Sequence, residues 1–203
     1  NTLCHSNVCV GYYAGENYSI NQNGGNKNVA IGYKAHQAGT TSGECVYIGY
    51  GAGQEVKTGV NNVAVGQNAG QGAYNQAGGS QNTSIGHESG KRFTTGENNS
   101  LLGVFSGDNI TTGNNNVCIG ANAGDSGTNN LTTGSNNILI GHDAAATASN
   151  VSNEITLGDV NITKFRIPGI DVVLKDNGGT PTQGHVLTVD ANGEASFAAA
   201  SGG

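Results

Sequence analysis

Nine glycines recur along this chain at nearly constant spacing, and this repeat is the feature that most constrains the fold. These anchor glycines are Gly11, Gly32, Gly49, Gly66, Gly86, Gly103, Gly120, Gly141 and Gly158. The steps between neighbours are 21, 17, 17, 20, 17, 17, 21 and 17 residues. A fixed period of this length is typical of a solenoid, in which each repeat forms one coil that stacks on the next.

The residues before each anchor glycine predict a short strand. The pattern Asn-apolar-x-apolar-Gly occurs at Asn7–Gly11, Asn28–Gly32, Asn62–Gly66, Asn82–Gly86, Asn99–Gly103, Asn116–Gly120 and Asn137–Gly141, with Cys45–Gly49 and Glu154–Gly158 as variants. Its apolar residues alternate with period two, as in a strand with one buried face. We therefore expect Ile31, Ile48 and Val65 to point into the coil. The asparagines are expected to stack along one corner and bond the backbone.

Each coil is expected to contain a second inward strand. Four segments begin with an apolar residue ten positions before the next anchor glycine, namely Val56–Gly59, Phe93–Gly96, Ile110–Gly113 and Leu131–Gly134. The extra residues of the longer steps, such as 125–130, would bulge as loops just before this strand. The spacing also leaves a second geometry open, in which three successive repeats make one turn of a wider three-faced prism.

Composition excludes several classes of protein. The chain of 203 residues contains 35 Gly but only 2 Pro, so a collagen helix is excluded. Only 11% of residues are charged, which argues against ordinary disorder, and no apolar run is long enough for a membrane span. The 8 Lys and Arg residues form no cluster, and the net charge is −6. We therefore expect neither nucleic-acid binding nor membrane insertion.

The repeat stops after Gly158, and the remaining residues predict a separate small module. Thr163–Leu174 is expected to form strands interrupted at Pro168-Gly169, and an Asn-Gly turn between 190 and 195 predicts a β-hairpin. The predicted domains are a repeat domain over 1–158 and a strand and hairpin connector over 159–203. The predicted fold class is all-β: a parallel β-solenoid of about 17 residues per coil, followed by a small β-hairpin segment.

Two groups of known repeats resemble this pattern. Ile-Gly-Tyr-Lys-Ala-His at 31–36 and its relatives at 85–90 and 119–124 resemble single hexapeptide units of left-handed β-helices. Hexapeptide acyltransferases carry several such units per coil, whereas this chain has one, which disfavours that activity. The fuller pattern Asn-x-Val-Ala-Ile-Gly-x-x-Ala, over 7–158, resembles the head repeats of trimeric autotransporter adhesins and repeats of phage tail fibres. This resemblance implies a left-handed β-roll that assembles as a homotrimer. The segment 179–197 is similar to one that connects shaft modules in such fibres.

The residue two positions before each anchor glycine is expected to point away from the coil interior. A solvated face would not normally be so apolar, so we interpret these residues as the subunit interface. They are Cys9, Ala30, Tyr47, Ala64, Ser84, Leu101, Cys118, Leu139 and Thr156.

A second set of outward residues could contact a glycan. Aromatic residues follow several anchor glycines at corner positions, namely Tyr12, Tyr13, Tyr33, Tyr50 and Phe105. Aromatic rings of this kind stack on sugars, although packing against a neighbouring chain would use them equally well. Seven Asn-x-Ser/Thr sequons also occur, which Asn- and Thr-rich sequence produces by accident and which a eukaryotic source could glycosylate.

No catalytic, cofactor or metal site is predicted. The four cysteines lack the spacing of a zinc site, and His87 and His142 lie three coils apart. No Ser/His/Asp set or carboxylate pair stands out, so we expect no enzymatic activity and no cofactor.

The leading hypothesis for function is a structural segment of an extracellular, trimeric fibre. We expect a viral tail fibre on the virion surface that holds a tip toward a cell-surface glycan or protein receptor. The alternative is a bacterial or archaeal surface adhesin or self-assembling filament subunit. A third hypothesis, a glycan-degrading enzyme on a β-helix, would require a carboxylate pair in a groove.

Overall fold

The structure is a computed structural model that describes residues 6–18, 26–74, 76–127, 129–167, 172–175, 185–189 and 194–199. Within these ranges every regular element is a β-strand. The chain divides into two compact units, Asn1–Asp159 and Val160–Gly203. This division lies within one residue of the domain boundary that the sequence predicts.

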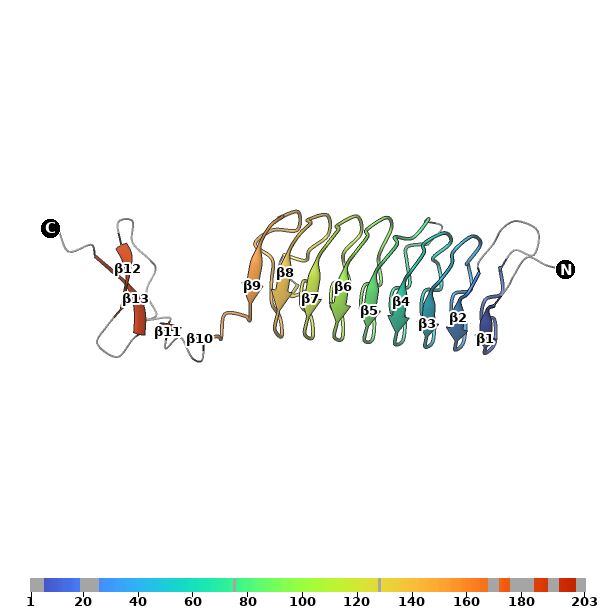
Figure 1. Ribbon diagram of the computed structural model, residues 1–203, viewed down its shortest axis with the longest axis horizontal. Helices are drawn as coiled ribbons and strands as arrows, with labels where there is room; N and C mark the ends of the chain where they lie inside the picture. Colours follow the sequence, from blue (N-terminus) through green and yellow to red (C-terminus); the bar gives the residue numbers. More distant parts are fainter. Residues whose placement is uncertain are drawn as a thin grey trace. The chain divides into compact units, whose positions relative to one another are not determined.

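The first unit is a parallel β-solenoid, which confirms the predicted fold class. Each coil contributes one three-residue strand to a single sheet, in the order β1 to β9 (Figure 1). The strands are β1 (Val8–Val10), β2 (Val29–Ile31), β3 (Val46–Ile48), β4 (Val63–Val65), β5 (Thr83–Ile85), β6 (Ser100–Leu102), β7 (Val117–Ile119), β8 (Ile138–Ile140) and β9 (Ile155–Leu157). Ala30 pairs with Tyr47, and Tyr47 pairs with Ala64. Since each repeat pairs with the next, one repeat makes one coil, and the wider three-faced prism is excluded.

The predicted second strands do not form as strands. Equivalent backbone groups in this part of the coil are still hydrogen-bonded, as from Thr94 N to Thr111 O (2.9 Å) and from Thr111 N to Thr132 O (2.9 Å). Each segment bends at the two residues after its apolar residue, as at Thr94 and Thr95, which leaves no length for a continuous ladder. Their apolar residues do point inward as predicted: Val56, Phe93, Ile110 and Leu131 are all buried.

The strand faces are inverted relative to the prediction. Residues two positions before the anchor glycine fill the coil interior, and none of the seven in β2 to β8 is more than 2% exposed: Ala30, Tyr47, Ala64, Ser84, Leu101, Cys118 and Leu139. In the end strands, Cys9 is exposed and Thr156 is half-buried. Ile31 and Ile48 lie on the outer face, and Val65 is half-buried. The predicted interface residues of β2 to β8 are therefore core residues, and their neighbours face outward.

Several positions of each coil contribute side chains to the interior. The small residue three positions after the anchor glycine is buried completely, as in Ala52 and Ser106. The buried asparagines and one large side chain from the Val56, Phe93, Ile110 or Leu131 position also occupy the interior. The inward strand position holds a small residue in four of these seven strands and a large one, Tyr47, Leu101 or Leu139, in the other three. Hydrophobicity alone suggested the opposite face because Val and Ile occupy the outward positions.

The asparagines form the predicted ladder along one corner. Asn99 Nδ2 donates to Gly113 O (2.9 Å) in its own coil and to Asn82 Oδ1 (3.0 Å) in the preceding coil. Asn99 Oδ1 in turn accepts from the backbone N–H of Asn116 (3.0 Å). Each buried amide thus satisfies backbone groups within its coil and in the next coil, as buried polar groups require.

The anchor position requires glycine for two reasons. Gly66 has a φ of +136°, which other residues rarely adopt. A Cβ on Gly66 would also lie 2.5 Å from the carbonyl oxygen of Gly86 in the next coil. Close stacking of successive turns therefore excludes any side chain at this corner.

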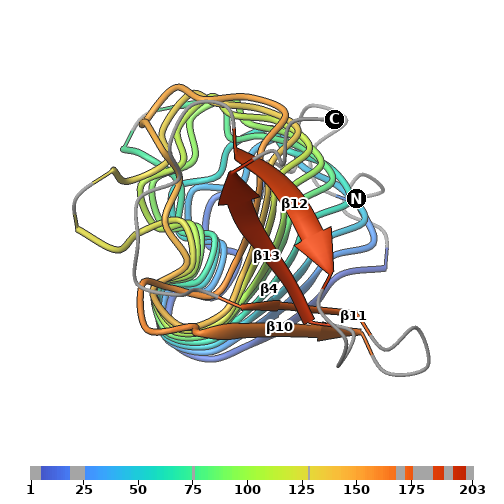
Figure 2. The ribbon, with the colours of Figure 1, turned by 90° about the vertical axis from the view of Figure 1, so that its left-hand side faces the viewer.

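The second unit is a four-stranded sheet in the order β10-β11-β13-β12. Its strands are β10 (Lys164–Ile167), β11 (Val172–Lys175), β12 (His185–Val189) and β13 (Glu194–Ala199). The antiparallel pair of β12 and β13 is the predicted hairpin (Figure 2). The turns expected at Pro168-Gly169 and at the Asn-Gly pair lie outside the described residues.

The asparagine ladder predicts a large effect for one side chain. In Asn99→Ala, the N–H of Asn116 and the carbonyl of Gly113 lose a buried partner, so we expect a loss of about 2 to 3 kcal/mol in unfolding free energy. Urea unfolding followed by circular dichroism measures this loss. Thr95→Ala, at an exposed position nearby, is the control and should change stability by less than about 0.5 kcal/mol. Equal midpoints for the two variants would contradict the proposed role of the ladder.

Candidate functional site

An apolar column runs along the outer face of the solenoid sheet. It consists of the residues directly before the anchor glycines, of which Ile31, Ile48, Ile85, Leu102, Ile119 and Ile140 are between 36% and 49% exposed. The residues two positions earlier lie beside it on the same face, and most of them, such as Val46 and Val117, are half-buried. Nine strands at about 4.8 Å spacing make this column about 38 Å long. An aliphatic face of this length is unusual for a monomer and is a candidate contact surface.

Three tyrosines form a second outward column at the N-terminal end. The rings of Tyr12 and Tyr33 are stacked with centroids 5.8 Å apart, and those of Tyr33 and Tyr50 are stacked with centroids 5.0 Å apart. Tyr13 joins the group through a tilted contact with Tyr12 at 3.9 Å. Because Tyr33 has a ring on either side, it offers solvent its edge and hydroxyl rather than an open face.

The structure does not bring Phe105 to the tyrosines. Phe105 lies three coils beyond Tyr50, is half-buried, and contacts the ring of His87 edge-on with centroids 5.1 Å apart. Four of the five aromatic residues predicted for glycan contact therefore share one surface, and the fifth belongs to a different one.

A shallow hollow contains an aromatic residue that the sequence reasoning missed. Its volume is about 280 Å³, and it is lined by Asn17, Gln37, Ala38, Glu55, Lys57 and Tyr74. Tyr74 is 83% exposed, so its ring is open to a ligand in a way that Tyr33 is not. It does not follow an anchor glycine but lies in one of the longer steps, where the repeat gives no register.

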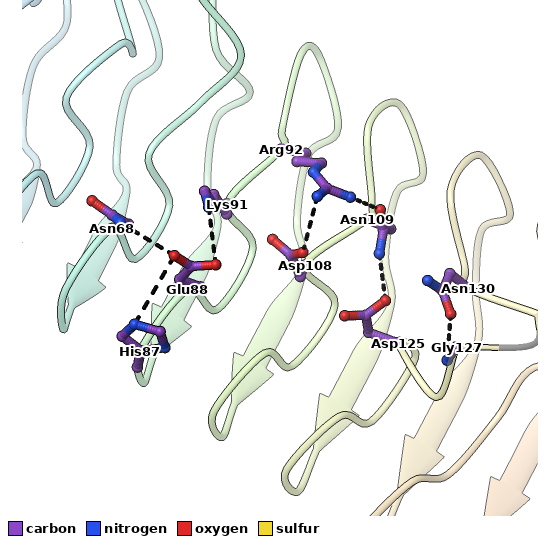
Figure 3. Close-up of polar contacts among 10 residues, drawn as sticks. All are labelled: Asn68, His87, Glu88, Lys91, Arg92, Asp108, Asn109, Asp125, Gly127 and Asn130. Atoms are coloured by element: carbon purple, nitrogen blue, oxygen red, sulfur yellow. Dashed lines mark hydrogen bonds and ion pairs between the residues drawn. The ribbon is translucent and has the colours of Figure 1, made fainter.

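Polar side chains link the middle coils along another side of the solenoid (Figure 3). Glu88 forms an ion pair with Lys91 (2.9 Å) and accepts a hydrogen bond from Asn68 (3.3 Å). Arg92 contacts Asp108 Oδ2 (3.7 Å) and donates to Asn109 in the next coil. Asn109 donates onward to Asp125. These contacts join four successive coils through their side chains.

Asp108 and Asp125 occupy the same position in successive coils, so the structure does align two carboxylates. Burial raises the pKa of both groups, and the nearby Asp125 carboxylate raises that of Asp108 further, while Arg92 opposes the rise. Asp108 Oδ1 is buried and has no hydrogen-bond partner among the described residues. Arg92 and Asn109 hold the pair within the coil-to-coil network, and neither aspartate lines the hollow around Tyr74.

A Ser–His–Tyr set lies inside the N-terminal coils. His36 Nδ1 is 2.7 Å from Tyr18 Oη, and His36 Nε2 is 2.8 Å from Ser42 Oγ. Both His36 and Ser42 are 0% exposed, so no substrate can reach the serine hydroxyl. Burial lowers the pKa of His36 to about 3, which keeps the imidazole neutral. The set therefore acts as a hydrogen-bonded part of the core.

The cysteines in the solenoid core are unreactive. Cys45 and Cys118 are free thiols and buried. Burial raises the pKa of Cys118 to about 12, so almost no thiolate forms at neutral pH. Cys4 lies outside the described residues.

No protein-family model matches the chain, and searches of curated proteins and of solved structures return no significant match. The described ranges contain no helix that is long and apolar enough to cross a membrane.

The buried histidine predicts a specific loss of stability in acid. The ordinary pKa of histidine is 6.5 and that of His36 in the folded chain is about 3, so its stabilising contribution is present above pH 6.5 and is lost as the pH falls toward 3. Between pH 7 and pH 4.5 the unfolding free energy of the wild type should fall by about 2.5 kcal/mol more than that of His36→Asn, since one pKa unit corresponds to about 1.4 kcal/mol. Asparagine is chosen because it tolerates the positive φ of 48° at this position.

Urea midpoints at the two pH values measure this difference. His87→Asn is the control because the His87 side chain is 39% exposed and lies outside the core, so this variant should not reproduce the effect of His36→Asn. Parallel pH dependence of the wild type and His36→Asn would contradict the assignment of His36 as a neutral core residue.

Proposed function

We propose that this chain is a non-enzymatic structural segment of an extracellular trimeric fibre, most specifically of a viral tail fibre that serves host attachment. The observation that carries the proposal is the outward aliphatic column over the full length of the sheet. Three parallel copies that turn this face toward a common axis would bury the column along the whole solenoid. Equivalent coils would then meet at equal height, as closed cyclic symmetry requires.

The construction of each chain fits a mechanical role. Backbone hydrogen bonds join each pair of neighbouring strands, and the asparagine ladder adds buried bonds along one corner. Bending such a rod would break many of these bonds at once. A trimer of rods that share an apolar seam would resist bending further and could hold a receptor-binding tip away from a particle.

Attachment would involve the exposed aromatic surface. Tyr12, Tyr13, Tyr33 and Tyr50 present ring edges and hydroxyl groups at one end of the solenoid, where they can hydrogen-bond the hydroxyls of a surface glycan. Phe105 lies on a different surface and would contact the glycan independently of the tyrosines. This contact extends the fibre proposal and is not required for the assembly itself.

The assembly state tests the role of the apolar column. Light scattering coupled to size-exclusion chromatography should give the wild type a mass three times that of one chain. Ile85→Lys places an ammonium group in the middle of the column, where burial without a partner is unfavourable, so we expect monomers. Thr95→Lys places the same charge at an exposed polar position outside the sheet and should leave the trimer intact. A monomeric wild type, or an Ile85→Lys trimer, would overturn this use of the face.

The location of the chain distinguishes the fibre from its alternative. An antibody against the solenoid, viewed by immunogold electron microscopy, should label fibres that project from virus particles. Labelling of a bacterial or archaeal envelope would instead support the surface adhesin or filament subunit, with the same coil and assembly. Preimmune serum on the same grids is the control.

A further inference from the structure

Three metal-ligating side chains meet at the C-terminal end of the solenoid, apart from the surfaces described above. They are His142, Asp143 and Asp159, and one potential ligand atom from each lies within 4.8 Å of the other two. In the described part of the chain, no other group of three or more His, Cys, Asp or Glu residues meets this geometry.

The repeat places these residues together. His142 and Asp143 directly follow the anchor Gly141, and Asp159 directly follows the anchor Gly158. Ile140 pairs with Leu157 across β8 and β9, so the two glycine turns lie one strand spacing apart. Residues that are 17 positions apart in sequence are therefore neighbours on the surface.

Asp143 is positioned for a second contact. Asn122 Nδ2, in the preceding coil, donates to Asp143 Oδ1 (2.8 Å). The other oxygen, Oδ2, lies 3.0 Å from His142 Nδ1. The hydrogen bond from Asn122 thus fixes the carboxylate with Oδ2 turned toward the imidazole, as residues around metal ligands commonly do.

The donor set selects the class of ion. One imidazole and two carboxylates provide three ligands, which suits Zn²⁺ and similar transition-metal dications and leaves a position for water. Ca²⁺ and Mg²⁺ prefer oxygen ligands throughout. The His142 side chain is 67% exposed, so an ion can enter directly from solvent.

The chain provides its own comparison three coils earlier. His87 and Glu88 follow the anchor Gly86 as His142 and Asp143 follow Gly141, and His87 Nε2 lies 4.0 Å from Glu88 Oε1. The next coil presents Val104 at the position of Asp159, and Lys91 already pairs with Glu88 at 2.9 Å. The same His-acid pair is thus present there without a third ligand and with a competing cation.

We propose that His142, Asp143 and Asp159 bind one Zn²⁺-class ion that joins the turn after β8 to the turn after β9. The ion bridges the last two coils through side chains and adds to the backbone bonds of β8 and β9. Its effect is local, because it stabilises the strand that has a solenoid neighbour on only one side.

Isothermal titration of the full chain with ZnCl₂ tests the proposal, with the protein free of polyhistidine tag and pretreated with chelator. We expect one equivalent of Zn²⁺ per chain and no competition from a large excess of Ca²⁺ or Mg²⁺. Asp159→Asn and His142→Ala should each weaken binding by about tenfold or more. His87→Ala should bind as the wild type does. Circular dichroism and thermal melts of the metal-free variants establish that each is folded.

Cobalt substitution gives a readout that does not depend on the variants. Co²⁺ bound to the wild type should show visible d–d absorption and no thiolate charge-transfer band in the near ultraviolet. Absence of Zn²⁺ binding at millimolar concentration would overturn the proposal. Unchanged affinity in both Asp159→Asn and His142→Ala would also overturn it, as would a thiolate band, which would assign the ion to a cysteine.

Discussion

Hydrogen bonds between equivalent residues of successive coils are the constraint on which the rest of this structure depends. Each coil must present the same backbone groups at the same height, so insertions are confined to corners where a loop can leave the stack. The anchor glycines keep the coils close, since a Cβ on Gly66 would collide with the turn of the next coil. The spacing of the strands then fixes which side chains can touch from one coil to another.

The stack and its register could be predicted from the sequence because both follow from the spacing of glycine and asparagine. The orientation of the strands could not, because alternation gives the period of a strand but not its phase. Val and Ile are more hydrophobic than the Ala, Ser and Cys between them, so the pattern favoured Ile48 inside and Tyr47 outside. The structure has the opposite phase: Tyr47 is buried, and Ile48 forms part of the outer column.

The candidate sites were predictable only where they follow the repeat in a visible way. Tyr12, Tyr33 and Tyr50 each follow an anchor glycine, and the structure stacks their rings. Asp159 stands one coil after His142 in the same position, so aligning the repeats by their glycines would have paired them. His36 is different, because it occupies a position that is glycine in most other coils and bonds Tyr18, a residue of the preceding coil. Tyr74 lies in a longer step, where the repeat offers no register.

The two outward columns beside the anchor glycines differ in how uniform their residues are from coil to coil. The residue before the anchor glycine is aliphatic in every coil from β1 to β9, which suits a contact that extends over the full length of the solenoid. The residue after the glycine varies: it is tyrosine in the first three coils and then Gln, His, Val, Ala, His and Asp, which suits chemistry confined to one or two coils. Inward positions must satisfy the stack, so their identities report on stability. Function in such a solenoid is therefore best sought by comparing the outward residues of one column, since adjacent coils, rather than adjacent residues, assemble its surfaces.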